Sequence, residues 1–238
     1  MIKTDKTYKD PKRKVGSQSE TPTIEYNNDE IIVGGYQKFT INKKTKEIKY
    51  IGKKSKFIYI NELMHTLNSK YKCNSIVDIG CNSGLSSLIA LNNNFESIFS
   101  LDHDVEYIKT LSRIKKDCGI TKITEMVYSF GDTLTEKFDV VFCGALIHWI
   151  FSLTSNFRNF NIILEYLISL TNKYLIIEWI DPTDKAIRSL NHIKKRKRKN
   201  DESYNTINFE KAIKNFATII SKKGADRSTR TIYVLKKL

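Results

Sequence analysis

The sequence predicts an α/β fold, in which helices cover both faces of a mostly parallel sheet. Short apolar strands alternate with amphipathic helices from Ile76 onward, a pattern typical of a parallel sheet buried on both sides. A glycine-containing turn over 78–84 joins the first of these strands to the helix that follows it. The last two strands, at 217–221 and 231–235, are joined by a short loop, so we expect them to run antiparallel.

Hydrophobic periodicity places the individual elements. Strands are predicted at 30–33, 36–41 and 47–51, the last two forming a small hairpin around 42–46, and a helix follows over 57–68. In the alternating region we expect strands at 76–79, 98–101, 123–128, 138–143 and 174–179, and helices at 83–91, 105–116, 160–170 and 209–216. The chain thus divides into a disordered polar tail (1–23), a basic hairpin arm (24–56) and a main domain (57–238).

The charge of the chain favours an anionic partner. The 238 residues carry a formal net charge of +14, with seven Lys and one Glu in Lys43–Lys56 and six consecutive basic residues in Lys194–Lys199. These segments could bind a phosphate backbone, and the aromatic residues near the first of them could stack on bases. Alternatively, the charge reflects a composition rich in Lys, Asn and Ile, and the aromatic residues pack the inner face of the hairpin. The candidates for stacking are Tyr36, Phe39, Tyr50, Phe57 and Tyr59.

The remaining composition indicates a cytosolic or nuclear protein without a membrane segment. Cysteines at 73, 81, 118 and 143 lack the paired spacing of a disulfide framework or zinc site, so we expect free thiols and no bound metal. The N-terminal segment has no apolar core of a signal peptide, and the longest apolar runs are only of strand length.

The turn over 78–84 has the features of a cofactor site. Gly80 permits a sharp turn, and Gly84 permits close packing of helix on strand. The following helix N-terminus is suited to an anionic group such as a carboxylate. Asn82 occupies the second glycine position of the dinucleotide fingerprint, which argues against a nicotinamide oxidoreductase, and Asp78 suits a cofactor that carries an ammonium group.

Two further carboxylates follow the next strands. Asp102, at the end of the second strand, is suited to accept hydrogen bonds from ribose hydroxyls, and Asp132, after the third, could meet an adenine amino group. An Asp in this position can instead be a helix cap, and for Asp132 the two interpretations are evenly balanced.

These motifs resemble the class I S-adenosylmethionine-dependent methyltransferase superfamily. The resemblance covers residues 57–238 and lies in VDIGCNSG (77–84), SLDHD (100–104) and FDVVFCGALIHWI (138–150); a weaker likeness, over 145–148, 175–182 and 228–233, points to bacterial methyltransferases related to nodulation proteins. It implies a Rossmann-like seven-stranded sheet with an antiparallel C-terminal strand, and S-adenosylmethionine as cofactor. The residues it implicates in cofactor contacts are Asp78, Gly80, Cys81, Asn82, Gly84, Asp102, His103 and Asp132.

Missing motifs restrict the reaction. No Pro-Cys or Thr-Cys pair offers the nucleophile that cytosine C5 methylation requires, which leaves O- or N-methylation. Cys143–Leu146 lacks the Asn/Asp-Pro-Pro-Tyr of amino-directed nucleic-acid enzymes, and Gly144 stands where ribose 2′-O enzymes of one type have an Asp. Among candidate catalytic residues, His148 has a suitable pKa for a general base but could simply pack the loop. Glu178 lies in an apolar strand, which indicates either a role in the site or a fixed ion pair.

From these observations we expect a methyltransferase acting on RNA or another nucleic acid. The alternatives are a small-molecule methyltransferase and a non-catalytic nucleic-acid-binding module that keeps the fold.

Overall fold

The computed structural model describes residues 21–52, 55–154, 156–157, 159–188, 203–225 and 229–238. They fall into two compact units that divide after Tyr128, and each is described by itself below. The basic segment Lys194–Lys199, which was predicted to bind phosphates, and the first 20 residues lie outside the described part. None of the helices in the described part is long and apolar enough to cross a membrane.

Seven strands form the mostly parallel sheet that the sequence predicted, in the order β10-β11-β9-β8-β5-β6-β7. The described pairs β5–β6, β6–β7 and β8–β9 are parallel, and β11 is antiparallel to both β9 and β10. The predicted fold class is therefore confirmed, including its antiparallel C-terminal strand. The bounds of the seven strands are β5 Ser75–Ile79, β6 Ser97–Asp102, β7 Ile123–Val127, β8 Phe138–Cys143, β9 Thr171–Ile180, β10 Ala217–Gly224 and β11 Arg230–Lys237.

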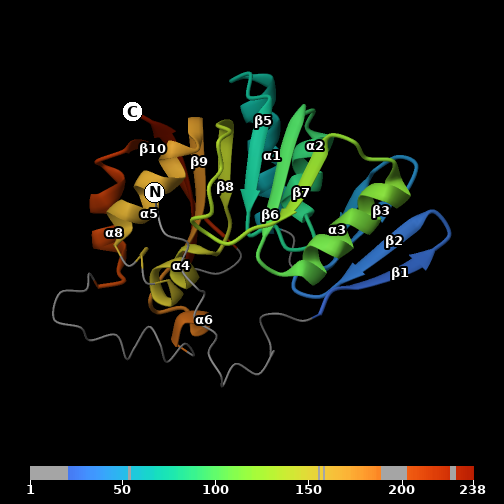
Figure 1. Ribbon diagram of the computed structural model, residues 1–238, viewed down its shortest axis with the longest axis horizontal. Helices are drawn as coiled ribbons and strands as arrows, with labels where there is room; N and C mark the ends of the chain where they lie inside the picture. The colour runs from blue at the N-terminus through green and yellow to red at the C-terminus, as the bar shows by residue number, and fades with distance from the viewer. Residues whose placement is uncertain (1–20, 53–54, 155, 158, 189–202, 226–228) are drawn as a thin grey trace. The chain divides into compact units, whose positions relative to one another are not determined.

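The N-terminal extension is a four-stranded antiparallel sheet (Figure 1). Its strands are β1 (Thr23–Asn27), β2 (Glu30–Gly34), β3 (Phe39–Asn42) and β4 (Ile48–Tyr50). In β2 and β3 alternate residues are buried, as expected for strands with one covered face: these are Ile31, Val33, Phe39 and Ile41. The hairpin β3–β4 was predicted, whereas β1 was not, because four of its five residues are exposed and give no apolar alternation.

This small sheet contacts the helices of the same unit. The Tyr26 hydroxyl donates to Asp117 Oδ2 at 2.7 Å, which joins β1 to helix α3 (Val105–Cys118), beside the small sheet in Figure 1. The Asn92 side chain at the end of α2 (Leu85–Asn92) donates to the Lys46 carbonyl at 3.0 Å. The remaining helix, α1 (Ser55–Ser69), buries Ile60, Met64 and Leu67.

The second unit, from Ser129 onward, holds the C-terminal half of the large sheet and its helices. These are α4 (Ile147–Leu153), α5 (Phe160–Ser169), α6 (Lys185–Arg188) and α8 (Thr206–Ile213). The core around β9 is aromatic: the Trp179 ring stacks on Tyr204 at 4.6 Å and on Phe209 at 4.3 Å. No disulfide joins the four cysteines of the chain, and all four are buried.

Candidate cofactor and acceptor sites

The turn after β5 adopts a backbone that only glycine and asparagine tolerate easily. Gly80, Asn82 and Gly84 have φ of 80°, 53° and 84°, in the left-handed region. The backbone N–H groups of Gly80 and Cys81 both donate to the Leu101 carbonyl, at 2.7 and 3.0 Å, which fixes the turn against the end of β6. The turn that the sequence indicated is thus a preformed loop beside Asp102.

Asp102 organises this loop with its carboxylate. Its Oδ2 accepts the Asn82 N–H at 2.8 Å, and its Oδ1 accepts the Asp104 N–H at 2.9 Å. His103 Nδ1 lies 3.4 Å from Asp102 Oδ1, with its side chain 59% exposed. A carboxylate has about four acceptor positions, so two backbone hydrogen bonds leave capacity for ligand hydroxyls.

Asp78 lies inside the protein and contacts α2. The Ser87 hydroxyl donates to Asp78 Oδ2 at 2.8 Å, and the Ser100 hydroxyl donates to Ser87 Oγ at 2.7 Å. Burial raises the pKa of Asp78 to about 7, although hydrogen bonds from the Ser87 hydroxyl and N–H oppose this rise. The carboxylate therefore fixes the first turn of α2 from inside the protein.

Gln37, in the loop between β2 and β3, contacts the N-terminus of α2 and was not singled out from its sequence context. Its side-chain Oε1 accepts the Leu85 N–H at 3.1 Å. The N-cap of α2 is Gly84, which has no side chain to supply this hydrogen bond. A contact between residues so far apart in the chain leaves no local pattern in the sequence.

Cys81, the remaining predicted residue of the turn, is fully buried. Burial raises the pKa of its thiol, and the neighbouring carboxylates of Asp78 and Asp102 raise it further. Its thiol is therefore not a candidate nucleophile.

In the second unit, Asp132 closes a tight turn. Its Oδ2 accepts the Ser129 N–H at 2.8 Å, and its own N–H donates to the Ser129 carbonyl at 2.9 Å. The Tyr166 hydroxyl donates to the Asp132 carbonyl at 2.8 Å. This geometry gives Asp132 a structural role in its loop, and an adenine contact stays a prediction.

His148 lies on α4, after a strained connection from β8. Ala145 has a φ of 31°, unusual for a residue with a side chain, and α4 begins two residues later. His148 is only 3% exposed, and its ring lies 5.1 Å from that of Trp149. A role as general base stays a prediction.

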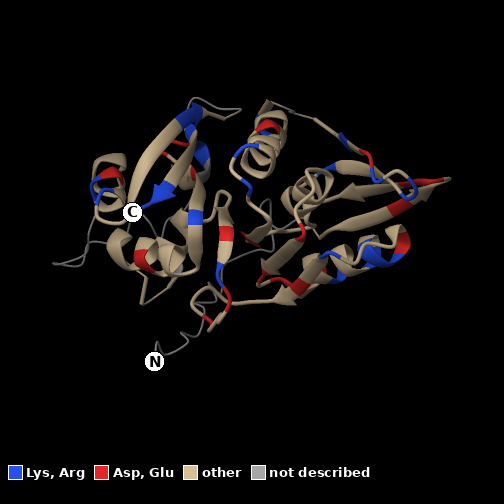
Figure 2. Cartoon of the chain, turned by 90° about the horizontal axis from the view of Figure 1, so that it is seen from above, with Lys and Arg blue, Asp and Glu red and all other residues tan. Residues whose placement is uncertain are grey.

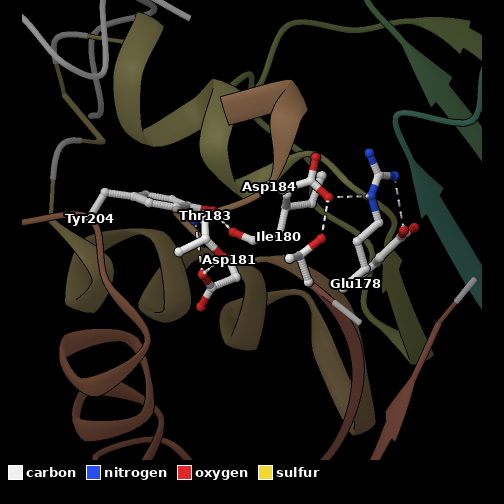
Figure 3. A network of polar contacts seen from close by, with 8 residues as sticks. Glu178, Ile180, Asp181, Thr183, Asp184 and Tyr204 are labelled. Carbon is white, nitrogen blue, oxygen red and sulfur yellow. Dashed lines mark hydrogen bonds and ion pairs between the residues drawn. The ribbon is translucent and has the colours of Figure 1, made fainter. Parts of the chain in front are cut away.

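Glu178 forms a buried ion pair with Arg230 of the neighbouring strand (Figure 3). Arg230 Nη1 lies 3.4 Å from Glu178 Oε1, and Arg230 Nε lies 3.3 Å from Asp184 Oδ2. The Thr229 hydroxyl also donates to Asp184 Oδ2, at 2.6 Å. The Glu178 and Asp184 side chains are 3% and 1% exposed, and the guanidinium supplies a counter-charge to both of these buried carboxylates.

A second polar chain in Figure 3 begins at Asp181, just after β9. Its Oδ1 accepts the Thr183 hydroxyl at 2.6 Å, and its Oδ2 accepts the Thr206 hydroxyl at 3.0 Å. Burial raises the pKa of Asp181, but hydrogen bonds from Thr183 and Thr206 outweigh it and lower the pKa below its usual value. The Tyr204 hydroxyl donates to the Ile180 carbonyl at 2.8 Å, so residues 204–206 are held against the end of β9.

Three solved structures that resemble this fold are methyltransferases. Magnesium protoporphyrin IX methyltransferase from Synechocystis PCC 6803, with bound SAH, gives a TM-score of 0.56 at 14% identity over 76% of this chain and 82% of that one. N-methyltransferase NodS from Bradyrhizobium japonicum WM9, also with SAH, gives 0.55 at 10% identity over 76% and 86%. The 16S rRNA methylase RmtB gives 0.54 at 14% identity over 78% and 64%. At these identities the likeness shows the fold alone.

The fold, the turn and a family model agree on the class of protein. They indicate a class I S-adenosylmethionine-dependent methyltransferase, with S-adenosylmethionine as the methyl donor. Residues 60–169 match the family model of ribosomal protein L11 methyltransferase (PrmA), which is less than half of the chain. No curated protein matches the sequence.

Proposed function

We propose that this methyltransferase transfers the methyl group of S-adenosylmethionine to an O or N atom of RNA. The binding of the cofactor is supported above all by the loop after β5. In this loop Asn82 lies between two glycines with positive φ, and its N–H donates to Asp102. Gly80 and Gly84 have no side chains to obstruct a ligand there. Asp102 retains acceptor capacity for the ribose hydroxyls, so these residues fit the cofactor.

The protein has two tasks in this reaction. The sulfonium of the bound cofactor supplies an electrophilic methyl group, and the chain aligns the acceptor atom with it. The second task is to remove a proton where the acceptor requires it. His148 is the proposed base, since the Glu178 carboxylate is already paired with Arg230.

Charge supports RNA as the acceptor. Residues 1–20 contain six basic and three acidic residues, and residues 189–202 contain six basic and two acidic. Within the described part, basic and acidic residues are interspersed (Figure 2), and lysines of the small sheet form ion pairs with Asp29 and Glu30. These two segments together carry +7 of the net charge of +14, and this charge could neutralise several phosphates.

A small-molecule acceptor is the second candidate, and the surroundings of β9 favour it. Three carboxylates, Glu178, Asp181 and Asp184, lie at or just beyond the end of this strand, with Arg230 as the cation that contacts two of them. This cluster of carboxylates disfavours a phosphate backbone and suits a neutral or cationic acceptor.

Calorimetry with S-adenosylmethionine tests the cofactor half. We expect micromolar binding, and Asp102→Ala should weaken it at least tenfold, because ribose hydrogen bonds to a charged acceptor are lost. Asp104→Ala is the matched control: this nearby carboxylate caps α3 through the Glu106 N–H and should not affect affinity. Absence of binding by the intact protein would refute the proposal.

Methyl-labelled S-adenosylmethionine in a cell extract tests the acceptor. Label that is released by RNase, and whose incorporation falls steeply with added salt, would support RNA. Label that resists RNase and protease and leaves with small metabolites would replace RNA by the second candidate.

A further inference from the structure

We infer that Gln37 of the small N-terminal sheet binds the carboxylate of the S-adenosylmethionine methionyl group through its side-chain Nε2. This inference rests on the proposed function and assigns a cofactor-binding residue outside the glycine turn.

The first turn of α2 already has two hydrogen-bond partners from the protein. The Leu85 N–H donates to Gln37 Oε1, and the Ser87 N–H donates to Asp78. A helix N-terminus binds anions through such N–H groups, and here two of them are occupied. A ligand carboxylate at this position would therefore gain from a further donor.

Gln37 offers such a donor. The Leu85 N–H can only be accepted by an oxygen, so the orientation of the amide is fixed and Nε2 is the remaining group. No acceptor for this NH₂ group lies among the described residues, although Gln37 is only 9% exposed. The Nε2 group is not among the fully buried atoms that lack a partner, so it keeps access to solvent and a ligand beside the α2 N-terminus can reach it.

Ser83 supplies a second, independent observation. It directly precedes the Gly84 N-cap, and its hydroxyl is fully buried without a hydrogen-bond partner among the described residues. Two polar groups with unused hydrogen-bonding capacity thus lie beside the positive end of the α2 dipole, which favours an anion. The carboxylate is the anionic group of S-adenosylmethionine, since its sulfonium and ammonium are cations.

Two substitutions separate ligand binding from helix capping. Gln37→Ala removes both the cap and the donor. Gln37→Glu keeps an acceptor for the Leu85 N–H but replaces the donor with a negative charge. We expect S-adenosylhomocysteine, which retains the carboxylate, to bind about tenfold more weakly to Gln37→Ala and still more weakly to Gln37→Glu.

Truncated ligand and a matched variant serve as controls. 5′-Methylthioadenosine lacks the amino-acid part, so its affinity should stay within about twofold of wild type in both variants. Asn92→Ala removes the other side-chain contact between the small sheet and α2 and should leave both affinities unchanged. Amide hydrogen exchange at Leu85 should accelerate in Gln37→Ala and stay slow in Gln37→Glu, which shows that the latter keeps the cap.

Calorimetry on the full chain decides the matter. Wild-type affinity of Gln37→Glu for S-adenosylhomocysteine, with the Leu85 amide still protected, would overturn the inference and make Gln37 a helix cap only. An equal loss for both ligands would overturn it as well, since the defect would not involve the carboxylate. If the wild type binds neither ligand, the proposed function itself fails.

Discussion

Substitution of Gly84 by Ala provides a quantitative test of how tightly the turn after β5 packs. Gly84 and Gly119 both adopt positive φ, 84° and 60°, so an Ala at either position should lose about 1 kcal/mol of stability from backbone strain alone. Their surroundings differ. A Cβ at Gly84 would lie 2.6 Å from Leu111 Cδ1, whereas a Cβ at Gly119 would meet nothing within 4 Å.

The difference between the two variants isolates the close packing of the turn on α3. Leu111 is fully buried, so its displacement should add about 1–3 kcal/mol, as overpacking of a core usually does. We expect Gly119→Ala to lower the free energy of unfolding by about 1 kcal/mol and Gly84→Ala by about 3 kcal/mol. Urea unfolding followed by far-ultraviolet circular dichroism measures both, provided that the slopes match.

A double substitution checks the cause. In Gly84→Ala/Leu111→Ala the methyl group no longer meets Leu111, so the double variant should be more stable than the sum of the single effects predicts, by about 1 kcal/mol or more. Equal unfolding midpoints for Gly84→Ala and Gly119→Ala, or strict additivity in the double variant, would refute the reasoning.

Three further predictions concern buried titratable groups. With its pKa raised to about 7, Asp78 keeps a proton in the folded chain that the unfolded chain releases near pH 4, so stability falls as the pH rises through this window. Between pH 5 and pH 8, the free energy of unfolding should fall by about 3 kcal/mol less in Asp78→Asn than in the wild type. Urea midpoints of the two proteins that change in parallel with pH would contradict this. Arg230→Ala leaves Glu178 and Asp184 buried without their shared cation and should destabilise the protein by about 3–5 kcal/mol in urea unfolding, whereas a loss below about 1 kcal/mol would show that the ion pairs contribute little. His148→Ala should lower turnover about 10²-fold with cofactor affinity retained, and unchanged turnover would make it a packing residue.

Local patterns were sufficient for the sheet and the turn. Strands such as Phe138–Cys143 could be predicted because a short, mainly apolar run is typical of a strand buried in a parallel sheet. The turn could be predicted because positive φ restricts its positions to Gly and Asn, and three such residues stand together. In each case the residues that indicate the structure lie within a few positions of one another in the chain.

Features that depend on tertiary contacts could not be predicted. Helix α4 was expected as a loop, because its seven residues are too few to show helical periodicity. The Glu178–Arg230 pair joins two strands far apart in the chain, so an ion pair was only one of two interpretations of a carboxylate in an apolar strand. The Gln37–Leu85 hydrogen bond was not predicted at all, since nothing near either residue indicates the other.

The location of Trp179 in the aromatic core of the second unit also has a spectroscopic consequence. The two tryptophans of the chain, Trp149 and Trp179, both lie after Tyr128, in the second compact unit. Intrinsic tryptophan emission therefore reports unfolding of that unit, whereas far-ultraviolet circular dichroism reports both. Comparison of the two signals in Gly84→Ala, whose defect lies in the first unit, measures directly whether the two compact units unfold as one cooperative body.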